Sequence, residues 1–161
     1  MNTEDADLLF DLLTERRVLS LAVVDQRQLP VIGMVPFVAA ADLEAALIHV
    51  SRLAPHGKEL KSGAAFAALI RGPDDGELPP GQIPRVRFNG TAELLDRGTE
   101  AHTDGRAVYL ERFPESEVTF QLGDFDLYRL KFERGRLVAG FARTVNLKPE
   151  SLIRLVGSRS G

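Results

Sequence analysis

An apolar run gives way to basic side chains in Ile48-His49-Val50-Ser51-Arg52-Leu53-Ala54-Pro55-His56-Gly57-Lys58-Glu59-Leu60. The apolar part predicts a strand that ends near Val50, and residues 56–62 predict one or two helical turns closed by Gly63. The free N–H groups at a helix start carry partial positive charge, so basic side chains beside them favour a bound anion. The stretch therefore predicts an anion site, with phosphate as the first candidate.

Four side chains of this stretch are candidates to hold the phosphate. Arg52 and Lys58 can donate charge-assisted hydrogen bonds, and the Ser51 hydroxyl and nearby backbone N–H groups can complete the cradle. His56 is first interpreted as a structural loop residue, although Gly57 beside it lets the backbone approach a ligand. The alternative for the whole cluster is a solvated loop, because exposed basic residues are common.

Working outward, apolar periodicity and turn residues predict a mainly β (α+β) chain. Strands and helices do not alternate regularly, which favours an antiparallel barrel over a parallel sheet. In the segment from Arg85, strict alternation puts Arg85 and Arg87 on one strand face. The predicted elements are a helix over 4–17, strands over 18–24, 31–40, 46–50, 64–71 and 85–95, a helix over 98–113, a hairpin of 120–132 and 136–143 that turns at 133–135, and a short helix from 148.

Composition limits the class of protein. The chain has 161 residues, a net charge of −3 and 44% hydrophobic residues, which fits one domain over residues 1–161 and argues against a nucleic-acid or membrane-surface role. It has no cysteine, which excludes disulfides and thiolate chemistry. The acidic N-terminal residues lack the pattern of a signal peptide, and we expect a cytoplasmic protein.

Common catalytic motifs are absent from the sequence. The three histidines do not form a metal-ligand pattern, no Gly-x-Ser-x-Gly elbow occurs, and no glycine-rich nucleotide loop is present. We therefore expect no tightly bound metal and name no catalytic residue. The segment Gly33-Met34-Val35-Pro36-Phe37 is first interpreted as core, and alternatively as an edge strand that hydrogen-bonds the rim of a flat heteroaromatic ring.

Three segments together resemble the FMN-binding split barrels related to pyridoxamine 5′-phosphate oxidase, in the branch similar to haem-utilisation proteins of the HugZ type. The segments are Val35-Pro36-Phe37, Ser51-Arg52-Leu53-Ala54-Pro55-His56, and Leu122 to Leu130 running on to Gly140-Phe141-Ala142-Arg143. Their order and spacing cover residues 8–147.

The resemblance implies a six-stranded antiparallel split barrel with flanking helices, a homodimer, and FMN at the subunit interface. The FMN phosphate would lie near Ser51, Arg52 and Lys58, and His56 would be a further cofactor-binding residue. The isoalloxazine would lie along Met34, Val35 and Pro36, mainly against backbone. Further anion or partner contacts would come from Arg85, Arg87 and Arg143.

An FMN-dependent oxidoreductase acting on a small molecule is the leading functional hypothesis. Gly57 and Glu59 stand where the family commonly has Thr and Asn, which keeps a second hypothesis, a non-catalytic flavin or haem binding or storage protein. A relative that uses the deazaflavin F420 is the third. Haem oxygenases of the branch use a C-terminal histidine as iron ligand, and this sequence has no histidine after His102, which disfavours haem degradation by that mechanism.

Overall fold

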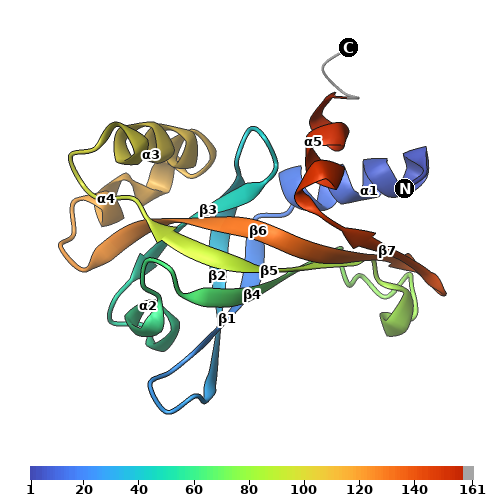
Figure 1. Ribbon diagram of the computed structural model, residues 1–161, viewed down its shortest axis with the longest axis horizontal. Helices are drawn as coiled ribbons and strands as arrows, with labels where there is room; N and C mark the ends of the chain where they lie inside the picture. The colour runs from blue at the N-terminus through green and yellow to red at the C-terminus, as the bar shows by residue number, and fades with distance from the viewer. Residues whose placement is uncertain (158–161) are drawn as a thin grey trace.

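Six antiparallel strands close into a barrel, and a seventh strand extends the sheet (Figure 1). The computed structural model describes residues 1–157, and residues 158–161 of the expected domain lie outside that part. The elements are α1 (Thr3–Thr14), β1 (Val18–Val24), β2 (Pro30–Ala39), β3 (Ala45–Ser51), α2 (Pro55–Glu59), β4 (Ala65–Arg71), the 3₁₀ turn η1 (Pro80–Gln82), β5 (Arg85–Leu94), α3 (Glu100–Arg112), η2 (Pro114–Ser116), α4 (Glu117–Phe120), β6 (Phe125–Gly140), β7 (Arg143–Leu147) and α5 (Pro149–Gly157).

The barrel closes because β6 pairs on both of its edges. The strand order is β3-β2-β1-β4-β5-β6-β7, and the first half of β6 also pairs with β3, from Phe125 opposite Ser51 to Lys131 opposite Ala45. The second half of β6 pairs with β7 along the same edge. The predicted six-stranded antiparallel split barrel with flanking helices is thereby confirmed, and the homodimer stays a prediction.

Alternating side chains fill the barrel and explain why the strands lie where they do. In β5, Val86 and Phe88 are buried inside, while Arg87 lies on the outer surface. Leucines of α1 pack onto the same core, and Asn2 caps this helix through a 2.8 Å hydrogen bond from the backbone N–H of Asp5 to its side chain. Figure 1 shows α1 and α2 on opposite sides of the barrel.

The prediction of a hairpin turning at residues 133–135 is wrong. β6 runs unbroken from Phe125 to Gly140, and the chain reverses only before β7 begins at Arg143. Gly135 is needed for another reason, because a Cβ on it would lie 2.7 Å from ring carbons of Phe88. The glycine allows a close packing contact inside the barrel and does not mark a turn.

Candidate functional site

The barrel is split beside the first half of β2. This strand pairs with β1 along its length, from Pro30 opposite Val24 to Pro36 opposite Val18. Among residues 1–157, its register with β3 covers only Phe37–Ala39. The other edge of residues 31–36 therefore has no strand partner in the described sheet. The edge-strand interpretation of Gly33–Phe37 fits this strand up to Pro36, whereas Phe37 pairs with Ile48 of β3.

Helix α2 lies in the split and packs closely against both sides of it. A Cβ on Gly33 of β2 would lie 2.2 Å from Nδ1 of His56, so the imidazole rests directly on the strand backbone. A Cβ on Gly57 would lie 2.0 Å from the backbone oxygen of Ser51. Burial lowers the pKa of His56, which favours the neutral imidazole. His56 and Gly57 therefore have packing roles at this position.

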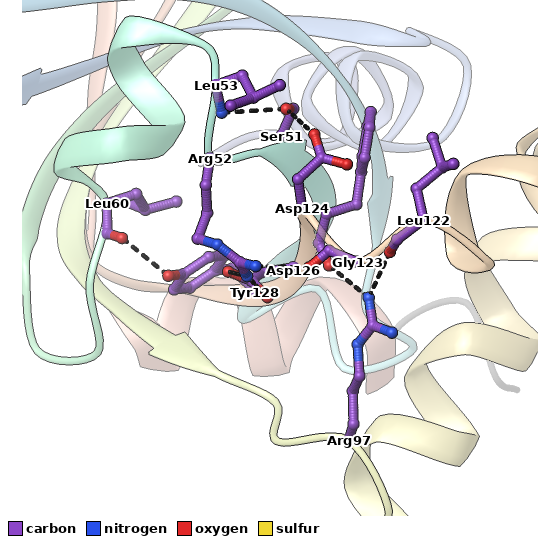
Figure 2. A network of polar contacts seen from close by, with 11 residues as sticks. Ser51, Arg52, Leu53, Leu60, Arg97, Leu122, Gly123, Asp124, Asp126 and Tyr128 are labelled. Carbon is purple, nitrogen blue, oxygen red and sulfur yellow. Dashed lines mark hydrogen bonds and ion pairs between the residues drawn. The ribbon is translucent and has the colours of Figure 1, made fainter.

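Ser51 and Arg52 are bound to carboxylates that follow them far along the chain (Figure 2). The Ser51 hydroxyl donates to Oδ2 of Asp124 at 2.7 Å, and Nη1 of Arg52 lies 2.6 Å from both carboxylate oxygens of Asp126. The hydrogen bond and charge of Asp126 raise the pKa of Arg52. A phosphate at this loop would have to compete with both carboxylates, because the charge of Arg52 is already balanced.

Arg97, which precedes α3, binds the backbone of the loop that carries Asp124. Its Nη2 donates to the backbone oxygens of Leu122 at 2.8 Å and Phe125 at 2.9 Å, on either side of Asp124 (Figure 2). The backbone N–H of Arg52 also donates to the backbone oxygen of Asp124 at 2.7 Å. This network fixes the loop before β6 against the end of β3.

The other predicted site residues are spread over the barrel. Lys58 is exposed on α2, Met34 and Pro36 point outward from β2, and the Val35 side chain is buried in the core, which leaves only its backbone for a ligand. Arg85 donates to the backbone oxygens of Gly81 and Ile83. Arg143 pairs with Glu4 at 3.1 Å and with Asp5 at 2.6 Å.

The basic residues predicted to bind the cofactor lie in two separate places on the barrel. Ser51, Arg52, His56 and Lys58 come together at the α2 end of the barrel. Arg85 instead lies opposite Val138 in the second half of β6, where β7 follows. Within one chain the two groups do not form a single pocket.

An outer-surface hollow was missed from the sequence. Met34, Ser20 and Leu69 occupy one cross-strand row of β2, β1 and β4, and Val18, Met34 and Leu69 expose 42%, 69% and 38% of their surface. These side chains line a hollow of about 510 Å³. The charged side chains that line it are Glu15, Arg16, Arg17 and Arg71.

The strand alternation could have revealed this face, because every second residue of a barrel strand points outward. The exposed positions of β2 include Ile32, which is 72% exposed. Apolar residues at outward positions of adjacent strands indicate a surface that binds a ligand or another protein.

The three histidines lie away from this hollow. His49 is buried on the α3 and α4 side of the sheet, where its ring stacks on Phe120 with centroids 3.7 Å apart. Burial, with smaller effects of Arg97 and His102, lowers the pKa of His49 to about 4. Within residues 1–157, no three histidine or acidic side chains gather to hold a metal ion, and no helix is long and apolar enough to cross a membrane.

The closed barrel with a split between β2 and β3 has the fold of the split barrels related to pyridoxamine 5′-phosphate oxidase. A solved structure of that fold, a protein from Clostridium acetobutylicum related to general stress protein 26 of the pyridoxinephosphate oxidase family, superposes with a TM-score of 0.68 at 10% identity, covering 94% of this chain and 99% of the other. No family model matches the chain.

Within that class the chain is a homologue of HutZ from Vibrio cholerae, which confirms the resemblance to the HugZ-like branch. The haem oxygenase HutZ is 28% identical over 151 residues, which are 91% of this chain and 83% of HutZ. A crystal structure of HutZ, described as a heme storage protein, gives a TM-score of 0.71 at 27% identity over 78% of this chain and 87% of that one.

A heme-binding protein from Mycobacterium smegmatis also has this fold. It gives a TM-score of 0.78 at 22% identity and covers 96% of this chain, which spans 61% of that protein. At this identity the likeness concerns the fold alone.

Proposed function

We propose that the protein binds haem on the outer face of the barrel, in place of the FMN-dependent oxidoreductase favoured by the sequence. The observation that carries the proposal is the hollow of about 510 Å³ with Val18, Met34 and Leu69 exposed beside arginines. Haem is a flat apolar macrocycle with two propionates, and this surface offers it apolar contact and cations. The similarity to HutZ, which is described as a haem oxygenase and as a haem storage protein, also supports haem as the ligand.

The residues of the hollow fit the two chemical parts of haem. Within the described chain, the Arg71 guanidinium donates one hydrogen bond, to the backbone oxygen of Gly72 at 3.1 Å. Its charge is therefore free for a propionate. Arg17 instead lies 3.5 Å from Glu115. Among the described residues that line the hollow, Met34 carries the only thioether and none is a histidine. A thioether is a known haem-iron ligand. Bound haem would supply redox chemistry, while these side chains bind and orient it.

A homodimer with the cofactor at the subunit interface is part of the proposal. Ile32, Met34 and Leu69 form an apolar outer face that a second copy could cover. The same contact would shield one side of a haem from water. Cytoplasmic location stays a prediction from the sequence.

FMN is the second candidate cofactor, favoured by the open edge of β2 over residues 31–36. Backbone groups on such an edge can hydrogen-bond the rim of a flavin, with the phosphate near His56 and Lys58. F420 would use the same contacts. We rank flavins second because Ser51 and Arg52 are already bonded to Asp124 and Asp126.

The proposal is tested by titrating haem into the purified protein and following the Soret absorption. Arg71→Gln should weaken haem binding about tenfold or more, because charge-assisted hydrogen bonds contribute roughly 1.5–3 kcal/mol. Arg27→Gln is the matched control, since Arg27 is an exposed arginine in the β1–β2 turn. Equal haem affinities in wild type, R71Q and R27Q would contradict this site.

Met34→Leu separates iron ligation from apolar contact. The substitution keeps the volume of the side chain and removes the thioether. We expect a changed Soret position with bound haem still present. A spectrum identical to that of wild type would remove Met34 as a ligand.

A further inference from the structure

Arginines face one another where β5, β6 and β7 lie side by side. Arg87 of β5 and Arg136 of β6 are directly opposed in the antiparallel register, and Arg134 is opposite Asn89. The side chains of such pairs start about 5 Å apart, and like charges at directly opposed positions are destabilising. This surface therefore carries an electrostatic cost in a protein whose net charge is −3.

Neutral groups orient Arg136 but leave its charge uncompensated. Its Nη1 donates to Oδ1 of Asn146 at 3.2 Å, and its Nη2 donates to Oγ1 of Thr144 at 3.1 Å, both from β7. None of the ion pairs formed within residues 1–157 involves Arg87, Arg134 or Arg136. The guanidinium of Arg136 is thus held in position while it remains available to an anion.

The arginines surround a small hollow of about 260 Å³. Lys148 adds a fourth cation, and the side chains of Asn89 and Asn146 add polar groups. Among residues 1–157, no acidic residue lines the hollow. Glu133, next to Arg134 in the chain, accepts a hydrogen bond from the Thr91 hydroxyl at 3.0 Å. In the part of the chain that the structure describes, this hollow shares no lining residue with the one assigned to haem.

We propose that this hollow binds a compact phosphate-type anion with two or more negative charges. Such an anion would remove the repulsion between Arg87 and Arg136 and accept hydrogen bonds from guanidinium and ammonium groups. The volume suits one or two phosphate groups and is too small for a haem or a flavin. The site is separate from the proposed haem function, and its test needs no haem.

The test uses the haem-free protein and pyrophosphate as the probe, with inorganic phosphate as a smaller second probe. Binding is measured by isothermal titration calorimetry and by the melting temperature, at an ionic strength held constant with chloride. We expect saturable binding of pyrophosphate to wild type and at least a tenfold loss of affinity in Arg87→Gln/Arg136→Gln. Arg27 is an exposed arginine beside Asp25 and provides the control. Arg27→Gln should bind pyrophosphate as wild type does.

A second readout separates a ligand site from a structural role of Arg87. Without any probe, Arg87→Gln should melt at the same or a higher temperature than wild type, because it removes a like-charge contact. With pyrophosphate present, wild type should melt at a higher temperature than Arg87→Gln. Absence of pyrophosphate binding to wild type, retained binding in the double variant, or a lower melting temperature of probe-free R87Q would each overturn the proposal.

Discussion

Lowering the pH should destabilise the protein through His49. The ordinary pKa of histidine is 6.5, and burial lowers the pKa of His49 to about 4. Between these values the unfolded chain binds a proton at this residue and the folded chain does not. Stability is therefore full above about pH 6.5 and is lost as the pH falls toward about 4.

The size of the effect follows from the two pKa values. One pKa unit corresponds to about 1.4 kcal/mol, which sets an upper bound of roughly 3.4 kcal/mol. Thr119, whose hydroxyl lies 3.2 Å from Nδ1 of His49, is only half-buried, so water screens part of the effect. We expect a loss of about 1–2 kcal/mol between about pH 7 and pH 5.

Urea unfolding at the two pH values, in wild type and His49→Phe, measures this loss. Phenylalanine can keep the stack on Phe120, and Thr119 keeps its hydrogen bond to the Ser116 oxygen at 2.8 Å. His56 and His102 also have pKa values lowered mainly by burial, and both residues are retained in H49F. An equal loss of stability in wild type and H49F between the two pH values would refute the reasoning.

Three further substitutions test other parts of the structure. Gly57→Ala should lower the free energy of unfolding in urea by about 1–3 kcal/mol, because the new Cβ would lie 2.0 Å from a backbone oxygen at the end of β3. Gly123→Ala is the control and should be neutral, because nothing lies within 4 Å of its Cβ position. Equal effects of the two substitutions would argue against the close packing of α2. Tyr128→Phe should cost about 1–3 kcal/mol in the same assay, because the buried Tyr128 hydroxyl donates to the Leu60 oxygen at 2.8 Å; an unchanged unfolding midpoint would argue against that bond. Arg52→Ala should leave haem affinity within about twofold of wild type in a Soret titration, and a large loss would move the ligand toward the α2 loop.

Strand positions were predictable where alternation is regular, as from Arg85 to Phe88 in β5. The sequence misled at Glu133-Arg134-Gly135, which has the composition of a turn but lies inside β6. Glycine serves there because Phe88, on a neighbouring strand, leaves no room for a Cβ. Such contacts depend on tertiary packing and leave no local signal.

The candidate site was only partly predictable for the same reason. The basic residues after β3 were visible, but the carboxylates that balance them come 73 and 74 positions later, at Asp124 and Asp126. Arg143 likewise finds Asp5 at a separation of 138 positions. Cations that form no ion pair within residues 1–157 also lie elsewhere, at Arg71 and at Arg87, Arg134 and Arg136 on the outer face of β5 and β6.

Parallel titrations of the same purified protein with haem and with FMN measure whether this split barrel prefers haem to flavin. Haem binding is followed by the Soret absorption, and FMN binding by quenching of flavin fluorescence. We expect saturable haem binding that is tighter than FMN binding and is weakened by Arg71→Gln. Saturable FMN binding without saturable haem binding would contradict it.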